Sequence, residues 1–461
     1  MLRKIMGITI LIIMLLLYAA NLNYSAGNEQ ISSKKDSVEK NTVDEIAPLI
    51  EEEVFPTYII EAFISKENRV TAKMAIDYTN NLNYGLEVVK LLLPANILYN
   101  EPYIRVNEIK IQNKPAVYKL DTGHAMVKLP ERLAPGEKIS ITMDFNTEVP
   151  IQGERFGYYL GVGMLSNWYP VIAPYDIKEK EWMEFHPSDF GDPYFFDSAF
   201  FKGHIRSSNN LQVISPFFPA TESAERTIWF DSKLPIRDLT LVYGENFSMM
   251  QKKVDDTIVQ YFYHKKRNFL DAAAESLQFY NEIYGRYPYE RLVVADVPLQ
   301  RLMGMEFSGM FFLSTRYRNI GEKTLAHEVA HQYWYGLVGS DQINEAWIDE
   351  SLANYSAILF LENKYGFKTY QEEINKIKRK NIGSSSLLSL QEYPSKFAYR
   401  EAVYEKPIML WDELRNYGGK ERVVSLLKSI QDKYHFRRIS TEALFGEIKP
   451  KFKEQEIDYD F

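Results

Sequence analysis

The sequence contains no cysteine among its 461 residues. Disulfide bonds and thiolate metal ligands are therefore excluded, so a metal site in this chain must use histidine and carboxylate groups. Histidine is also scarce, with seven in the chain, which makes any regular spacing of histidines informative. The formal net charge of −8 offers no basic surface for nucleic acid, and we expect no nucleic-acid partner. The sequence has no internal repeat and no glycine-rich phosphate-binding motif.

One uncharged apolar run approaches the length of a membrane span, and it lies near the N-terminus. Arg3 and Lys4 precede residues 5–20, which carry no charge. This order of charge and apolar run is typical of a signal peptide, and the run is somewhat short for a transmembrane helix. We therefore predict that residues 1–26 are a signal peptide or an N-terminal membrane anchor. The protein is expected to be extracytoplasmic, either secreted or attached to the cell membrane by this segment.

Length and local patterns predict more than one domain, because 461 residues exceed the usual size of a single domain. Residues 27–54 are rich in Ser, Lys, Asp and Glu and predict a polar spacer. Residues 55–250 read as a β domain, in which residues 58–65 and 70–78 flank a short polar turn and favour a hairpin. Residues 251–461 are expected to form a mainly helical domain.

Shorter patterns add detail to both domains. Alternating apolar and polar residues predict two further strands, and the aromatic clusters nearby are expected to fill a sheet core. The second domain is expected to begin with a helix and a short apolar strand. These segments are residues 104–112 and 138–145 (strands), 168–170 and 194–196 (aromatic clusters), 268–284 (helix) and 292–297 (apolar strand).

The most informative motif is His-Glu-x-x-His at His327, Glu328 and His331, followed by Glu350. Histidines four apart lie about 40° apart around a helix, so both imidazoles project from one face. Catalytic zinc sites commonly combine two histidines with one carboxylate and leave the fourth position open for water. We expect one Zn²⁺ per chain on His327, His331 and Glu350. Glu328 is placed to accept a proton from the metal-activated water. The alternative is a coincidence, which should occur in roughly one such chain in a hundred.

The residues around the motif predict the helix that carries it. Asn319 and Glu322 have the spacing of a capping box, and Gly336 is a typical helix stop. We therefore expect a helix over residues 320–335.

A second helix is expected to carry the third ligand. Residues 346–364 have a helical pattern that ends before Gly366. If the connection at residues 337–345 makes the two helices antiparallel, Glu350 returns to the two histidines. A single cation requires this arrangement.

Together these residues resemble the aminopeptidase N family of zinc metallopeptidases. These are gluzincins whose catalytic domain is similar to that of thermolysin. His-Glu-x-x-His, eighteen residues and then Glu match the zinc motif of the family at His327, His331 and Glu350. Gly304-Met305-Glu306-Phe307 is similar to the Gly-x-Met-Glu-Asn segment of the family, and Val403-Tyr404-Glu405-Lys406 is similar to its tyrosine motif. The resemblance covers most of the chain from about residue 55 onward.

The resemblance implies a multidomain fold, β and then α+β. An N-terminal β-sandwich or saddle domain would precede a thermolysin-like, mainly helical zinc-peptidase domain. The sequence resembles a short form without the large C-terminal helical domain of longer members. It departs from the family pattern at Phe307, where Asn is usual, and at Pro407, where Gly is common. Asp349 stands where Asn is also common.

The resemblance also implies catalytic and binding roles. Tyr404 would donate a hydrogen bond to the oxyanion of the tetrahedral intermediate, with Tyr399 as its nearest rival. Asn354 lies four residues after Glu350; an ordinary solvated Asn is the favoured interpretation, and a hydrogen bond to a zinc ligand is the alternative.

For the substrate, the resemblance implies that Glu306 binds the free α-amino group of a peptide. The alternative for this carboxylate is a salt bridge to Arg301 or Arg316. Gly304 and Met305 would line the cleft and pair with an extended peptide.

These expectations favour zinc-dependent hydrolysis of peptide bonds, with Glu328 as general base, that removes N-terminal residues from peptide substrates. Two alternatives stay open. The first is an endopeptidase or oligopeptidase that uses the same zinc site, and the second is a non-catalytic surface binding module.

Overall fold

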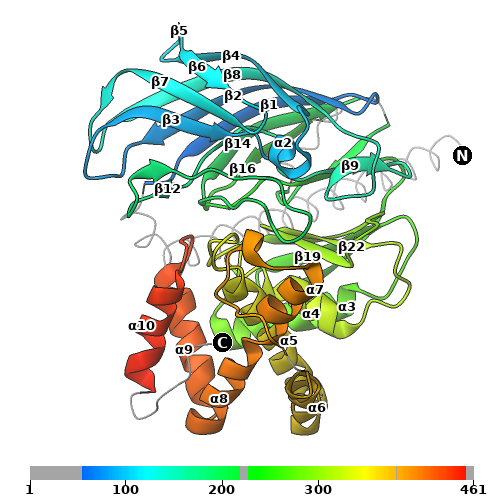
Figure 1. Ribbon diagram of the computed structural model, residues 1–461. Coiled ribbons are helices and arrows are strands. Elements are labelled where there is room, and N and C mark those ends of the chain that lie inside the picture. Colours follow the sequence, from blue (N-terminus) through cyan, green and yellow to red (C-terminus); the bar gives the residue numbers. More distant parts are fainter. Residues whose placement is uncertain (1–53, 209, 219–226, 381, 453–461) are drawn as a thin grey trace, which may run out of the picture. The chain divides into compact units, whose positions relative to one another are not determined.

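The computed structural model describes residues 54–208, 210–218, 227–380 and 382–452 (Figure 1). The predicted signal peptide or anchor and almost all of the predicted spacer lie outside these ranges and stay predictions. Contacts group Phe55–Phe461 into one compact unit. Within the described ranges, no helix is both long enough and apolar enough to cross a membrane.

The N-terminal half is built from β-sheets, drawn blue to green in Figure 1. The predicted hairpin is confirmed: β1 (Thr57–Ile64) pairs with β2 (Arg69–Thr79) antiparallel, with Tyr58 opposite Ile76. Both strands alternate between buried and accessible residues, because one face of the sheet covers a core. The largest sheet among the described residues has the order β16 (Thr227–Asp231), β14 (Phe200–Ser207), β1, β2, β8 (Lys138–Glu148), β4 (Ile104–Ile111) and β5 (Lys114–Pro115).

Two four-stranded sheets and a two-stranded one, β12 (Tyr175–Asp176) with β13 (Glu181–Trp182), complete this half, and a large apolar core lies beneath most of its strands. The predicted aromatic clusters lie in that core: Trp168, Tyr169 and Tyr194 are all at most 3% exposed. The first small sheet has the order β11 (Val171–Ile172), β3 (Leu86–Leu92), β7 (His124–Leu133) and β6 (Val117–Leu120). The second has the order β15 (Gln212–Ile214), β17 (Leu241–Gly244), β10 (Val162–Leu165) and β9 (Phe156–Tyr159).

A five-stranded sheet opens the C-terminal half, with the order β18 (Ser248–Val254), β19 (Thr257–Tyr263), β20 (Arg291–Val297), β22 (Met310–Ser314) and β21 (Gly304–Phe307). Every residue of β20 is buried, including Asp296 near its end, and the strand agrees with the mainly apolar segment predicted at residues 292–297. Strand β21 forms the edge and runs antiparallel to β22. Strand β21 therefore has a single neighbouring strand in this sheet among the described residues.

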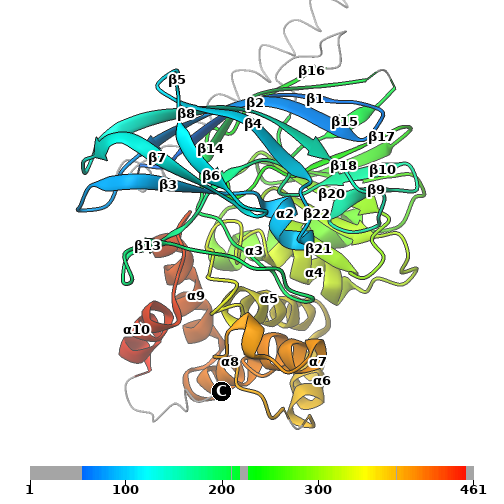
Figure 2. The ribbon, with the colours of Figure 1, turned by 45° about the horizontal axis from the view of Figure 1, so that its top comes forward.

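The remaining chain is mainly helical (Figure 2). The predicted fold class, β followed by a mainly helical α+β part, is therefore confirmed, whereas the domain boundary near residue 250 stays a prediction. The helices are α3 (Leu270–Tyr284), α4 (Glu322–Ala330), α5 (Trp347–Tyr365), α6 (Phe367–Lys378), α7 (Lys396–Arg400), α8 (Ile408–Gly418), α9 (Lys420–Tyr434) and α10 (Thr441–Lys451). A π-helical turn, Glu401–Glu405, separates α7 from α8.

The predicted bounds of the first motif helix are wrong at both ends. Helix α4 starts after Gly321, which has an extended backbone, so the expected capping box of Asn319 and Glu322 does not form. The helix ends at Ala330, with His331 as its C-cap, because the following chain turns sharply and Tyr335 adopts a positive φ of 139°. The second helix agrees with the prediction within a residue: α5 spans Trp347–Tyr365 and ends at Gly366.

Candidate metal centre

Helices α4 and α5 pack against each other and bring the three predicted ligands together. His327 lies in the last turn of α4, and His331 follows as its C-cap. Glu350 lies in the first turn of α5, where a carboxylate is favoured by the positive end of the helix dipole. Each ligand therefore sits at a helix end that fixes its backbone.

The distances among these side chains fit one cation. The two histidine Nε2 atoms are 3.0 Å apart, and Glu350 Oε2 lies 3.4 Å from each of them. Ligand atoms about 2.0–2.1 Å from a tetrahedral zinc ion lie roughly 3.4 Å from one another. The three atoms are thus spaced as ligands of a common metal are spaced.

Hydrogen bonding leaves the metal-facing atoms of the centre available. His331 Nδ1 donates to the carbonyl of Trp334 at 2.9 Å, so Nε2 carries the lone pair in the neutral ring. Glu350 Oε2 is buried and accepts no hydrogen bond of ordinary geometry within the described part of the chain. Two imidazole nitrogens and a carboxylate oxygen that face one another form a donor set suited to zinc.

The buried carboxylates of the centre also favour a bound cation. Burial raises the pKa of Glu328 to about 8. Burial would also raise the pKa of Glu350, but the imidazoles of His327 and His331, each 3.4 Å from its Oε2, outweigh burial and lower the pKa to about 2. Burial raises the pKa of Glu306 well above its ordinary value. Several buried carboxylates crowd this centre, and a divalent cation would relieve their repulsion.

Glu328 lies directly against β21. A Cβ added to Gly304 would fall under 3.0 Å from the carboxylate of Glu328, so any side chain at this point of the strand would displace that carboxylate. Glu328 is 5% exposed, and its Oε2 has no hydrogen-bond partner among the described residues. A proton acceptor therefore lies beside the edge strand to which a peptide could pair.

Glu306 is on the same strand and is 6% exposed. The alternative salt bridges are wrong, because Arg301 pairs with Glu154 at 2.9 Å and Arg316 donates to the carbonyl of Gln300 at 2.6 Å. Met305 is largely buried in an apolar cluster. Of the predicted cleft residues, Gly304 lies directly against Glu328 of the motif helix.

Tyr404 reaches the centre from the π-helical turn. The amide of Lys406 donates to the carbonyl of Glu401 at 2.9 Å, which widens the helix here. The Tyr404 ring centroid is 6.2 Å from that of His327, and the rings are nearly parallel. Tyr399 stands behind it, edge-on, at 6.2 Å. Tyr404 is therefore the nearer of the two predicted tyrosines to a metal ligand.

Asn354 fits neither of the two interpretations considered for it, a solvated side chain or a partner of a zinc ligand. Asn354 Nδ2 donates to the backbone carbonyl of Tyr404 at 3.0 Å. The side chain thereby ties the π-helical turn to α5.

Sequence reasoning missed a segment of the β half that reaches this region. Phe190 packs against Tyr399 with ring centroids 5.3 Å apart, and Gly191 lies against the Tyr399 hydroxyl. Asp192 follows and forms an ion pair with the largely buried Arg155. No local pattern marks these residues, since they lie in irregular chain and meet only in three dimensions.

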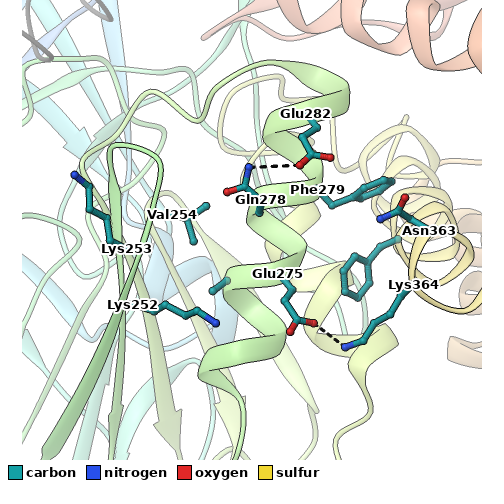
Figure 3. A pocket seen from close by; sticks show the side chains of 11 residues that line it. Lys252, Lys253, Val254, Glu275, Gln278, Phe279, Glu282, Asn363 and Lys364 are labelled. Atoms are coloured by element: carbon teal, nitrogen blue, oxygen red, sulfur yellow. Dashed lines mark hydrogen bonds and ion pairs between the residues drawn. The ribbon is translucent and has the colours of Figure 1, made fainter.

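A separate hollow of about 360 Å³ lies beside α3, α5 and the β18–β19 hairpin (Figure 3). Its lining includes Lys252, Phe279 and Asn363, and an ion pair of Glu275 with Lys364 at 2.7 Å crosses it. None of its lining residues belongs to the metal centre. The hollow is therefore distinct from the candidate site.

Comparison with known proteins identifies related chains. Residues 269–458 match the peptidase family M1 domain. Endoplasmic reticulum aminopeptidase 2 of Homo sapiens is 22% identical over 381 residues, which are 74% of this chain and 38% of that protein. Aminopeptidase M1-D of Oryza sativa subsp. japonica is 23% identical over 201 residues, 39% of this chain and 23% of that protein. The chain thus spans less than two-fifths of the length of these relatives.

Solved structures show the same fold. The M1 zinc metallopeptidase from Deinococcus radiodurans has a TM-score of 0.66 at 17% identity, and the match covers 87% of this chain and 91% of that one. A mutant of that protein bound to a Tyr-Ser-Ala substrate has a TM-score of 0.67 and covers 86% and 90%. The solved structures therefore confirm the predicted fold, and residues 269–458 of this chain match the peptidase family M1 domain, in agreement with the resemblance to the aminopeptidase N family.

Proposed function

We propose that this protein is a zinc-dependent peptidase that removes N-terminal residues from peptides. The observation that carries the proposal is the convergence of His327, His331 and Glu350 at zinc-ligand spacing beside the carboxylate of Glu328. The M1 domain supports peptide hydrolysis, and the relatives named above are aminopeptidases.

Each residue at the centre has a chemical task in this proposal. Zinc, when bound by His327, His331 and Glu350, supplies polarisation of the scissile carbonyl and a lowered pKa for water. Glu328 takes a proton from water and later delivers it to the leaving amine, for which its buried position beside β21 is suited. Tyr404 donates a hydrogen bond from its hydroxyl group to the developing oxyanion.

The substrate is placed by β21 and Glu306. An extended peptide can pair with the free edge of this strand through backbone hydrogen bonds. Glu306 is buried and is not neutralised by Arg301 or Arg316. A positively charged α-amino group of the substrate would compensate this carboxylate, which favours cleavage after the first residue.

The test of the reaction is Glu328→Gln. This variant should retain stoichiometric zinc and lose about 10²–10⁴-fold in hydrolysis of aminoacyl reporter amides, because the amide cannot act as a general base. The matched control is Glu322→Gln on the same helix, where the carboxylate forms an exposed ion pair with Lys364. Wild-type activity in Glu328→Gln, or purified wild-type protein that binds no zinc, would exclude the proposed mechanism.

The test of N-terminal specificity compares free and N-acetylated peptides of one sequence. An aminopeptidase should cleave the free peptide and spare the acetylated one, and Glu306→Gln should raise KM for the free peptide. Equal cleavage of both peptides would favour the endopeptidase alternative, which uses the same metal centre.

A further inference from the structure

Tyr335 has an unusual backbone conformation in the turn that follows the motif helix α4. Its φ of 139° is a conformation that residues with a Cβ rarely adopt. The residue before it is Trp334, whose carbonyl accepts the 2.9 Å hydrogen bond from His331 Nδ1. The peptide group between Trp334 and Tyr335 therefore sets the direction in which the His331 ring is held. Strain of this kind persists only where surrounding contacts impose it.

Arg237 supplies one of these contacts from the β half. Its side chain is 3% exposed, and its Nε donates to the carbonyl of Tyr335 at 2.7 Å. Further bonds run to the carbonyls of Phe196 at 2.7 Å and Arg437 at 3.3 Å. The guanidinium lies so close to the backbone of Gly339 that a Cβ there would collide with it. Arg237 is thus fixed from several sides and holds the backbone of Tyr335 in turn.

Asp238, the next residue, supplies the second contact. It is fully buried, and its Oδ2 accepts from the Tyr335 hydroxyl at 2.8 Å and from the amide of Ser308 at 3.0 Å. The amide of Arg237 also donates to Ser308 Oγ at 3.1 Å. Ser308 directly follows β21. Arg237 and Asp238 therefore bind both the turn after the motif helix α4 and the turn after β21.

We propose that Arg237 and Asp238 are positioning residues for the metal centre. They hold Tyr335 at both ends, by its carbonyl and its hydroxyl, and so fix the Trp334 carbonyl that orients His331 toward the metal. Neither residue contacts the metal ligands directly, and both come from the β half of the chain. Partners that orient a metal-bound histidine typically change metal affinity or activity by about 10–100-fold.

The inference rests on the proposed zinc function, and its readout is zinc affinity of the full chain rather than turnover. The dissociation constant is measured by competition with a chelator, well below the unfolding temperature. Arg237→Lys keeps the charge but loses the planar set of donors, and should weaken zinc binding by about 10–100-fold. Tyr335→Phe removes only one hydroxyl group and is the second test, in case Arg237→Lys does not fold. It should weaken zinc binding by about 10-fold.

The control is Tyr261→Phe. Tyr261 is also buried and donates to a buried carboxylate, that of Asp296, at 2.6 Å. Its loss should lower the melting temperature about as much as Tyr335→Phe and leave zinc affinity unchanged. The inference would be overturned if folded Arg237→Lys and Tyr335→Phe bound zinc with wild-type affinity, or if Tyr261→Phe weakened zinc binding equally. Either result would leave the proposed function standing. Absence of zinc binding in the wild type would overturn the proposed function together with the inference.

Discussion

At the scale of single residues, Gly304 allows strand β21 to approach closely the carboxylate of Glu328, the proposed general base. Gly304→Ala would place a methyl group under 3.0 Å from the Glu328 carboxylate. We expect a folded protein with full zinc content and kcat/KM lower by about 10²-fold, because displacement of about 1 Å at a reacting group has this effect. Steady-state kinetics and metal analysis measure it.

Gly446→Ala is the matched control for that change. Gly446 lies inside α10, and a Cβ there meets nothing within 4 Å. The substitution should leave kcat/KM unchanged and raise stability by about 0.5–1 kcal/mol, as alanine replaces glycine in a helix. If Gly304→Ala were as active as Gly446→Ala, the close approach of β21 to Glu328 would have no catalytic role.

Tyr404 and Tyr399 allow a second comparison at this scale. Tyr404→Phe should keep zinc and KM and lower kcat by about 10²–10³-fold, since it removes the proposed oxyanion donor without changing the ring. Tyr399→Phe should have a smaller effect, because Tyr399 lies behind Tyr404 and packs against Gly191. A larger loss of kcat in Tyr399→Phe would assign the oxyanion role to that residue instead.

The residues that sequence could identify are those whose spacing has a geometric meaning. His327 and His331 are four apart, so any helix brings them to one face, whatever its ends. The roles considered for Asn354, Arg301 and Arg316 depended on which neighbours a side chain meets. Each of these three found a partner that no local rule indicates.

At the scale of elements, alternation and stop signals predicted strands and helices where one face is buried. Hairpin β1–β2 and helix α5 agree with their patterns for this reason. The end of α4 does not, because the turn around Tyr335 is imposed by Arg237 and Asp238 from a distant part of the chain. The π-helical turn at Tyr404 has an ordinary helical sequence, so its extra residue per turn is visible only in the structure.

The packing of α5 on α8 gives a prediction about stability and pH. Glu362 is 9% exposed and receives two 2.7 Å hydrogen bonds from Arg415. Burial alone would raise the pKa of Glu362, but its bonds to Arg415 and the charge of Lys420 lower it below the ordinary value of 4.5. The pair therefore stabilises the fold above that pH and loses its contribution as the pH falls through the lowered pKa.

We expect Glu362→Gln to lower the free energy of unfolding at pH 7 by about 3 kcal/mol, since it leaves a buried cation unpaired. The difference from wild type should shrink as the pH falls below about 4. Denaturant titrations at several pH values measure both effects. Glu372→Gln is the control, because its pair with Lys368 is exposed, and a change of about 0.5 kcal/mol or less is expected. A pH-independent loss in Glu362→Gln would contradict the role of the ion pair.

At the scale of the whole molecule, contacts between distant segments join the β half to the helical half. Asp197 pairs with Arg438 at 2.7 Å, and Glu154 pairs with Arg301 at 2.9 Å. Arg237 adds buried bonds to Tyr335 and Arg437. Sequence patterns predicted both halves but not these contacts, since contacts between residues as much as 264 positions apart leave no periodic trace.

This junction predicts how the chain responds to loss of zinc. A ligand that binds only the folded chain stabilises it by about 4 kcal/mol at a thousandfold excess over its dissociation constant. Because the described halves share one compact unit, zinc should raise hydrogen-exchange protection in β2 of the first half as well as in α5 of the second. His327→Gln, which removes a ligand, should show neither increase. Zinc-dependent protection confined to the helices around the centre would mean that the two halves open independently and that the contacts of Arg237 do not couple them.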